Sequence, residues 1–244
     1  DNLQPIGDLL PSRQTAPRFP PPSIPETLLY PWLSVTMSAP HPHRVALFGT
    51  SADPPHNGHR SIMTTLGYQF DHVAVWASDN PWKTDQSPID MRMDMLRLAM
   101  ADLQTPSTIQ VHPELSHPFT AVTLERAREI WPQADFTFVI GADLIRQLPR
   151  WKRSEDVLEW SNILVFPRPG YPLSEDDLVE LRGLGARVAI ANPIHAIPDI
   201  SSTSLRQHCQ EPRTEIAAEI SPRVQAYIHQ HNLYPCPENT PTIP

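Results

Sequence analysis

The chain has 244 residues, a formal net charge of -8 and a sequence pI near 5.7. This length can bury one substantial core, so we expect one main domain with appended tails. The acidic balance argues against a protein that grips nucleic acid through a broad basic face. Any polyanionic ligand must therefore meet a local cationic site.

Proline marks both ends of the chain. Ten of the 30 prolines fall in residues 1–42 and four in the last ten residues. Because proline fixes φ and lacks a backbone N–H, these ends cannot form much regular structure. We predict an irregular arm over residues 1–43, a main domain over 44–234 and a tail over 235–244. The arm is either a solvated linker or a segment that packs on its own domain or a partner through the apolar residues at 28–32.

Between these ends, short apolar runs rich in β-branched residues alternate with longer amphipathic segments. The apolar runs predict strands at 44–48, 72–77, 108–112, 136–140, 162–166 and 187–191. The amphipathic segments predict helices at about 57–69, 88–102, 120–131, 153–160, 174–184, 203–209 and 221–231. This alternation indicates an α/β fold, with a mostly parallel, doubly wound sheet, helices on both faces and a small helical C-terminal part. In such sheets, ligands bind beyond the carboxyl ends of the strands.

Cysteine spacing and hydropathy predict the cellular compartment of the protein. Cys209 and Cys236 have neither a C-x-x-C nor a metal-ligand spacing, so we interpret them as reduced thiols of a cytoplasmic protein. No stretch approaches the ~18 apolar residues of a membrane span, and nothing at the start suggests export. The chain does not begin with Met, which leaves room for a leader that has been removed.

The turn after the first predicted strand reads "GTSADPPHNGH" over residues 49–59. Its small residues let an anion approach the backbone, and the helix that follows presents free N–H groups. His56 and His59, one helical turn apart, can donate to phosphate oxygens in either charge state. The alternatives are an Asp-Pro turn with two exposed histidines, or two ligands of a transition metal without an obvious third. Neither common glycine-rich phosphate motif occurs in the chain.

Three further segments also suit a nucleotide. The "SSTS" of residues 201–204 and Arg206 place hydroxyls and a guanidinium at a helix start, although capping is an alternative role for each hydroxyl. In the basic stretch "GADLIRQLPRWKR", Asp143 can accept from ribose hydroxyls and Trp151 can stack on a flat ring, unless the stretch is only a solvated helix end. Lys83 follows another strand and either reaches a phosphate or is an ordinary surface lysine.

Taken in order, these segments resemble the bacterial nicotinate-nucleotide adenylyltransferases, which belong to the nucleotidyltransferase superfamily named for its H-x-G-H motif. The resemblance runs from about Arg44 to Tyr234 and includes "HNGH", "GADL…LPRW", "VFPRPGYPL", "ISSTSLR" and "ISPRVQAYIHQHNLY". It implies a Rossmann-like sheet that transfers AMP from ATP to nicotinic acid mononucleotide (NaMN), giving deamido-NAD and pyrophosphate. It also implies Mg²⁺ bound with ATP, and we assign no protein residue as a metal ligand.

The resemblance further implies roles for matched residues. Four groups, His56, His59, Lys83 and Arg206, are expected to stabilise charge and position phosphates. Proton transfer is not required, because the NaMN phosphate is already an anion. Within the family, Gly141 and Asp143 correspond to ribose contacts and Trp151 to a stack on the pyridine ring. The expected substrate contacts are Gly49, Thr50, Ser51, Asp53, Thr120, Gly141, Asp143, Trp151, Lys152, Ser202 and Thr203.

The sequence departs from the family's usual motifs at three places. The common "GGTFDP" is "GTSADP" here, so Thr50 replaces a glycine and Ala52 a large apolar residue. The usual "SYT" is "PFT", of which we carry over Thr120. Lys152 follows Trp151 where an aromatic residue is common, and we hypothesise that Lys152 or neighbouring amides favour the nicotinate carboxylate.

Other functions remain open from the sequence. The substrate is alternatively nicotinamide mononucleotide (NMN) or phosphopantetheine, although Trp151 within "LPRW" favours a flat pyridine. A chain that kept the fold without catalysis would be a nucleotide-binding or regulatory module, but the intact histidines and "SSTSLR" speak against this. We expect small-molecule partners, no nucleic acid and no membrane, and we leave homo-oligomerisation open.

Overall fold

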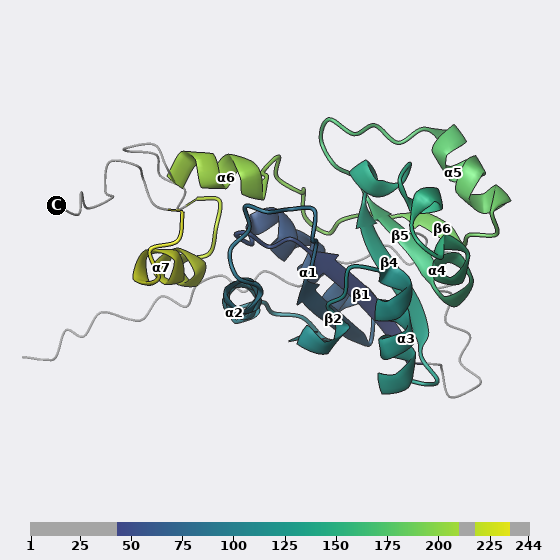
Figure 1. Cartoon of the computed structure of the whole chain (residues 1–244), viewed down its shortest axis with the longest axis horizontal. Helices are drawn as coiled ribbons and strands as arrows, with labels where there is room; N and C mark the ends of the chain where they lie inside the picture. Colours follow the sequence, from purple (N-terminus) through teal and green to yellow (C-terminus); the bar gives the residue numbers. More distant parts are fainter. Residues whose placement is uncertain (1–42, 210–217, 235–244) are drawn as a thin grey trace, which may run out of the picture. The chain divides into compact units, whose positions relative to one another are not determined.

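The computed structural model of the chain describes residues 43–209 and 218–234 (Figure 1). The predicted tail over 235–244 and nearly all of the predicted arm over 1–43 lie outside the described residues. Cys236 also lies outside them. In the described ranges, no helix combines the length and the apolar character needed to span a bilayer.

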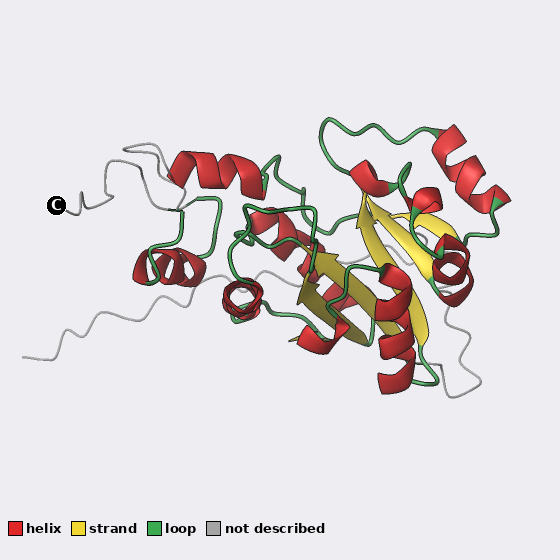
Figure 2. Ribbon diagram, in the orientation of Figure 1, coloured by secondary structure: helices red, strands yellow, loops and turns green. Residues whose placement is uncertain are grey.

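Six parallel strands form one sheet in the order β3-β2-β1-β4-β5-β6 (Figure 2). They are β1 (Arg44–Thr50), β2 (His72–Ala77), β3 (Thr108–Val111), β4 (Asp135–Gly141), β5 (Asn162–Phe166) and β6 (Val188–Ile190). All six predicted strands are confirmed, with ends that differ by at most two residues. The strand order changes direction between β1 and β4, and in doubly wound sheets ligands bind at the carboxyl ends of the strands beside such a point.

The helices also follow the predicted order. They are α1 (Asn57–Gln69), α2 (Ile89–Met100), α3 (Thr120–Ile130), α4 (Ser154–Trp160), α5 (Glu175–Gly183), α6 (Ser202–Cys209) and α7 (Pro222–Gln230). Short 3₁₀ turns lie at Pro113–Leu115, Ala142–Leu144 and Leu148–Arg150. The alternation of strand and helix confirms the predicted α/β class, because parallel neighbours need a crossover that brings the chain back to the same edge.

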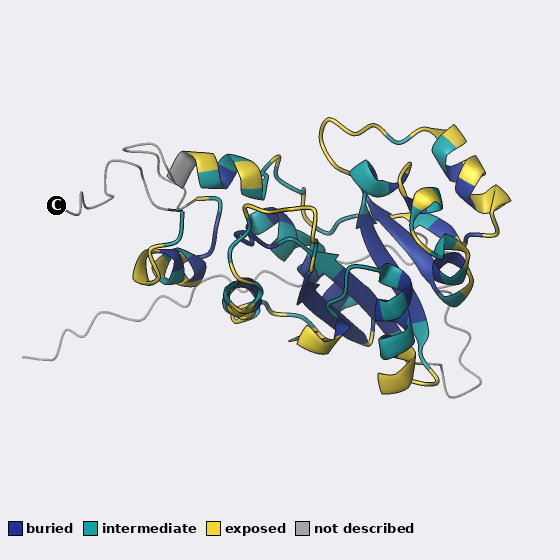
Figure 3. Cartoon of the chain, in the orientation of Figure 1, coloured by how far each residue is buried: buried dark blue, intermediate teal, exposed yellow. Residues whose placement is uncertain are grey.

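The central strands are buried on both faces (Figure 3), which explains why they read as unbroken apolar runs. Leu47 of β1 lies between Ala74 of β2 and Phe138 of β4 and has no exposed surface. The edge strand β3 instead alternates between exposed and half-buried residues. Burial of the central strands fixes their register, and so fixes which residues reach the carboxyl edge.

A second apolar cluster joins the C-terminal helices to α2 (Figure 1). Its buried members are Met95, Ala99, Leu205, Ile220, Val224 and Ile228. The cluster holds α6 and α7 beside α2, and thereby brings the start of α6 to the first strand-to-helix turn. The predicted helical C-terminal part is therefore packed on the main domain.

Candidate active site

The start of α1 carries both histidines of the "HNGH" segment. His56 is the N-cap residue, and its Nδ1 accepts a 3.1 Å hydrogen bond from the backbone N–H of Gly58. The backbone N–H of His56 in turn donates to Nδ1 of His59, also at 3.1 Å. Such reciprocal capping is usually made by Ser or Thr with Glu or Gln. Because both rings accept at Nδ1, each neutral ring carries its proton on Nε2.

The glycine inside this motif has a steric reason. The two imidazole centroids lie 3.9 Å apart, and the ring of His56 folds over the backbone of Gly58. A Cβ at residue 58 would lie 2.9 Å from both Nδ1 and Cε1 of His56, closer than non-bonded carbon atoms approach. Only glycine therefore lets His56 cap the helix in this way.

Both histidines are neutral at neutral pH in the free protein. Burial lowers the pKa of His56 to about 4, and the positive charge of Arg168 lowers it in the same direction. Burial also holds the pKa of His59 well below its usual range, with smaller contributions from His56 and Arg168. Each neutral ring therefore has a single N–H donor, at Nε2. The negative charge of a bound phosphate would raise both pKa values.

The first turn, residues 49–55, is contacted by a cation from another loop. Lys83 comes from the loop after β2, and its Nζ donates to Oγ of Ser51 at 2.9 Å. Gly49 is held by packing, since a Cβ there would lie 2.6 Å from the Trp76 ring. The sequence suggested that Lys83 reaches the site, and the structure does place it against this turn.

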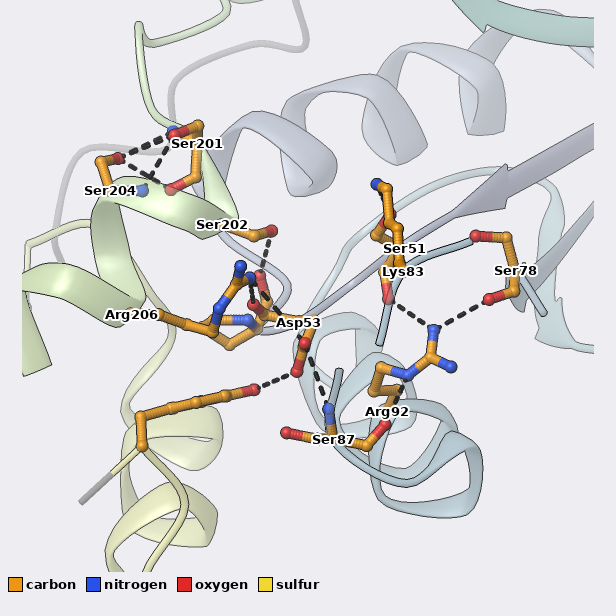
Figure 4. Close-up of polar contacts among 12 residues, drawn as sticks. Ser51, Asp53, Ser78, Lys83, Ser87, Arg92, Ser201, Ser202, Ser204 and Arg206 are labelled. Carbon is orange, nitrogen blue, oxygen red and sulfur yellow. Dashed lines mark hydrogen bonds and ion pairs between the residues drawn. The ribbon is translucent and has the colours of Figure 1, made fainter. Parts of the chain in front are cut away.

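Asp53 is buried, and Figure 4 shows it close to Arg206 and Ser87. Its side chain is fully buried, with Oδ1 accepting from the Tyr234 hydroxyl at 2.6 Å and Oδ2 from the backbone N–H of Ser87 at 3.2 Å. The Arg206 guanidinium lies 3.8 Å from Oδ2. We expected Asp53 to contact substrate. Because both oxygens are already bound within the protein, we now assign it to positioning.

The start of α6 is fastened to the first turn (Figure 4). Arg206 donates to the backbone oxygen of Asp53 at 2.8 Å, and Ser202 donates to that of Pro54 at 2.9 Å. Ser201 and Ser204 cap the helix reciprocally, so capping is the role of these two hydroxyls. The two segments expected to share one triphosphate are therefore in direct contact, although about 150 residues separate them in the sequence.

The residues after β4 form the other side of the switch point. Gly141 ends β4, and a Cβ there would collide with Oδ1 of Asp143. The other carboxylate oxygen of Asp143 accepts from Arg168 at 3.2 Å. Since β1 and β4 are adjacent and parallel, this segment emerges beside the first turn. A ribose that binds Asp143 would have to share or replace Arg168.

The aromatic and basic pair that follows is held by neighbouring rings. Trp151 is half-buried and meets Phe138 edge to face, with centroids 6.2 Å apart. The ammonium of Lys152 lies 4.4 Å from the centre of the Phe119 ring, a cation–π contact. Thr120 is the first residue of α3 and follows Phe119 directly. Lys152 therefore lies against the residue that precedes α3, and Trp151 adjoins Lys152 in the chain.

The basic stretch over residues 141–153 does not form a single cationic site. Arg146 pairs with Asp177 at 2.7 Å. Arg153 pairs with Glu125 and with Asp156. These carboxylates come from other helices or from the next turn of chain, so the sequence alone could not show that two of the four cations are neutralised locally.

The chain is similar in sequence to proteins of a known family. The sequence pattern of the cytidylyltransferase-like family matches residues 47–208. A probable nicotinate-nucleotide adenylyltransferase of Synechocystis sp. is 39% identical over 203 residues, which cover 78% of this chain and 98% of the relative. The chain belongs to the nicotinate-nucleotide adenylyltransferase family. A probable nicotinate-nucleotide adenylyltransferase of Thermus thermophilus is 33% identical over 199 residues, which cover 78% of this chain and 99% of the relative.

Solved structures share the family's fold. The Plasmodium falciparum nicotinic acid mononucleotide adenylyltransferase complexed with NaAD superposes with a TM-score of 0.67 at 19% identity. The alignment covers 80% of this chain and 98% of that one. A nicotinate-nucleotide adenylyltransferase structure from Vibrio parahaemolyticus gives a TM-score of 0.58 at 21% identity, covering 78% of this chain and 94% of that one. At these identities, the likeness concerns the fold alone.

The acidic residues Asp53 and Asp143 are both engaged by other groups of the protein. Within residues 43–209 and 218–234, no three His, Cys, Asp or Glu side chains are grouped so that they could hold a metal ion. Asp53 is enclosed by internal hydrogen bonds and Asp143 pairs with Arg168. Mg²⁺ keeps several waters and is commonly held by substrate phosphates with one or two carboxylates. Neither carboxylate could hold a metal ion without giving up a contact within the protein.

Sequence reasoning missed Arg168. It lies two residues after β5, inside the "VFPRPGYPL" segment that carried the resemblance, and its side chain is about 40% exposed. Its charge lowers the pKa of both motif histidines, and it lines a pocket of about 520 Å³ together with Tyr171 and Leu173. A cation just beyond the carboxyl end of a central strand is the signal that could have identified it.

Arg92 and Tyr234 were also missed, and the sequence offers little sign of them. Arg92 is almost fully buried and donates to the backbone oxygens of Ser51, Ser78 and Ser87 (Figure 4). In the sequence it resembles an ordinary surface residue of an amphipathic helix. These hydrogen bonds connect α2 to the first turn and to the loop that carries Lys83. They therefore help to fix the position of the turn.

Proposed function

We propose that this chain transfers the AMP moiety of ATP to NaMN, giving deamido-NAD and pyrophosphate. Membership of the nicotinate-nucleotide adenylyltransferase family supports this reaction. The observation that carries it in this chain is the contact between the "HNGH" turn and the start of α6. Arg206 and Ser202 bind the backbone of Asp53 and Pro54 at the carboxyl edge of the sheet.

The reaction needs no covalent intermediate and no general base. A phosphate oxygen of NaMN, already anionic at neutral pH, forms a bond to the α-phosphorus of ATP. The bond from that phosphorus to the oxygen bridging to the β-phosphate breaks, and pyrophosphate leaves with the electron pair. The protein therefore has to align the two reactants and stabilise charge on the transferring and leaving oxygens.

The donors of the site suit that task. His56 offers a neutral Nε2–H group from a ring that the helix start holds, while the Nε2–H group of His59 is held by the hydroxyl of Thr50. Lys83 and Arg206 add positive charge from the loop after β2 and from α6. Fixed donors that need no reorganisation during reaction stabilise a developing charge most effectively. When bound with ATP, Mg²⁺ would neutralise part of the charge on the phosphates.

The preference for the acid over the amide forms part of the proposal. Trp151 offers a ring for the pyridine, and Lys152 places an ammonium close by, over Phe119. The positive charge of Lys152 would favour a nicotinate carboxylate over a neutral carboxamide. This is the physical reason to choose NaMN over NMN.

The test is turnover of both mononucleotides by the wild-type chain. We expect pyrophosphate release from ATP with NaMN, with a new product of the mass of deamido-NAD. The value of kcat/KM for NMN should be at least tenfold lower. Equal turnover of both would overturn the role of Lys152, and no pyrophosphate with either would favour a non-catalytic nucleotide-binding module.

A further inference from the structure

The side chain of Thr50 contacts a motif histidine. Thr50 is the last residue of β1 and stands where the family resemblance predicts glycine. Its Oγ1 lies 2.8 Å from Nε2 of His59. Glycine has no side chain that could make this contact. The hydrogen bond is therefore a property of this chain's own sequence and not of the H-x-G-H motif.

The direction of this hydrogen bond follows from the helix cap. Nδ1 of His59 accepts from the backbone N–H of His56, so the single proton of the neutral ring is on Nε2. Nε2–H consequently donates to Oγ1 of Thr50. The hydroxyl accepts this proton and keeps its own O–H to donate. A chain of hydrogen bonds thus runs from the first turn of α1, through His59, to Thr50.

The hydroxyl also lies among the groups that we assign to phosphate. Thr50 is half-buried at the carboxyl end of β1. The hydroxyl of the next residue, Ser51, accepts from the ammonium of Lys83 at 2.9 Å. Two adjacent hydroxyls therefore connect the first turn to a neutral donor, His59, and to a cation, Lys83.

We propose that Thr50 is a positioning residue for His59: its hydroxyl accepts Nε2–H and fixes the ring, and His59 acts on a phosphate of the bound nucleotide through the O–H of Thr50. The inference rests on the proposed function, because it assumes that His59 serves a nucleotide phosphate. Hydrogen bonds in a chain polarise one another, so the O–H of Thr50 becomes a better donor to the same anion. With glycine at residue 50, water would take the place of the hydroxyl and the ring would be less restrained.

The experiment compares Thr50→Val, which keeps the shape and removes the hydroxyl, with Thr50→Ser, which keeps the hydroxyl. Nitrogen-15 NMR of the imidazole in the free protein reports on the hydrogen bond itself. We expect the Nε2–H of His59 to exchange with water at least tenfold faster in Thr50→Val than in the wild type, and at the wild-type rate in Thr50→Ser. We also expect kcat to fall about tenfold in Thr50→Val with an unchanged KM for NaMN, and Thr50→Ser to remain within twofold of wild type.

The matched control is Thr108→Val, at an exposed position that begins the edge strand β3, and it should behave as wild type. Thr50→Ala replaces Thr50→Val if the latter fails to fold. Unchanged exchange and unchanged kcat in the variant without the hydroxyl would overturn the proposal, as would a Thr50→Ser protein that is equally impaired. If the wild type forms no deamido-NAD, the proposed function fails, while proton exchange in the free protein still decides whether Thr50 holds His59.

Discussion

At the residue scale, each motif histidine uses one ring nitrogen to build the start of α1. The spacing of "HNGH" correctly predicts two neighbouring rings, because residues three apart share a helix face. It does not show that Nδ1 of each ring binds backbone. That contact depends on the extended conformation of His56, whose φ is -133° and ψ 177°. The charge state and tautomer of the two histidines, and their role in capping α1, therefore follow from the structure and not from the sequence.

Gly58→Ala tests this use of the rings. The added Cβ would lie 2.9 Å from the His56 ring and must displace it. We expect the free energy of unfolding to drop by about 1 kcal/mol through the weakened cap, and kcat/KM for ATP to drop at least tenfold. Urea denaturation and steady-state kinetics measure the two effects. Gly183→Ala, where a Cβ meets no atom within 4 Å, is the control. A fully active Gly58→Ala protein would show that the ring of His56 is not required in this place.

Arg168→Gln tests the electrostatics at the same scale. The positive charge of Arg168 disfavours the imidazolium form of His56, so its removal should raise the pKa of His56 above about 4 toward its ordinary value of 6.5. NMR titration of the ring protons measures this pKa. The control is Arg146→Gln, which breaks the ion pair with Asp177 and should leave the pKa of His56 unchanged. An unchanged or lowered pKa in Arg168→Gln would contradict the account.

At the element scale, Asp53 of the first turn is contacted by Ser87 just before α2, by Arg206 of α6 and by Tyr234 after α7. Periodicity predicts the three helices closely, because apolar residues recur at helical spacing. Their convergence could not be read from the sequence. Tyr234 contacts Asp53 across 181 positions, and no local pattern encodes so distant a contact. For the same reason the sequence suggested Asp53 as a substrate contact, whereas the structure encloses it.

Tyr234→Phe tests this convergence. The variant removes the hydroxyl that donates to Oδ1 of Asp53 at 2.6 Å and leaves a buried carboxylate with one donor fewer. We expect the free energy of unfolding to fall by about 1.5–3 kcal/mol. Chemical denaturation measures it, with Tyr227→Phe as control because that hydroxyl reaches Asp94 in an exposed pair at 3.3 Å. An equal loss of unfolding free energy in the two variants would mean that the hydrogen bond from Tyr234 to Asp53 stabilises the fold no more than an exposed one.

At the scale of the whole molecule, alternating strands and helices are enough to predict the sheet. Central strands such as β2 and β5 are buried along their full length, so their apolar runs are unbroken and easy to find. Charge partners are a different matter. Arg146 and Arg153 read as a cationic site because Asp177 and Glu125, which neutralise them, lie about 30 residues away in the sequence.

Acid stability is a property of the whole fold. Burial lowers the pKa of His72 to about 4, and His112 and His43 act in the same direction. The unfolded chain binds this proton at a higher pH than the folded one, so stability is full above about pH 6.5 and is lost as the pH falls toward 4. After allowing for partial solvent screening, we expect His72 to account for about 2 kcal/mol of that loss.

His72→Gln tests this expectation. The free energy of unfolding, measured by urea denaturation at pH 7, 6, 5 and 4, should fall less steeply in this variant than in the wild type. His195→Gln, at an exposed position, should follow the wild-type profile. Identical slopes for the wild type and His72→Gln would show that the buried imidazole is not a source of acid sensitivity.

The central claim is that the Nε2–H groups of the "HNGH" turn stabilise charge on ATP while AMP passes to NaMN, and that the Nε2–H group of His59 does so through the hydroxyl of Thr50. His59→Asn tests it most directly, because an asparagine oxygen can still accept the bond from the backbone of His56 while the Nε2–H donor is lost. The measurement is single-turnover pyrophosphate release from ATP and NaMN. We predict at least a hundredfold slower release by folded His59→Asn protein, alongside rapid release by the wild type. Release at the wild-type rate by His59→Asn would contradict the account.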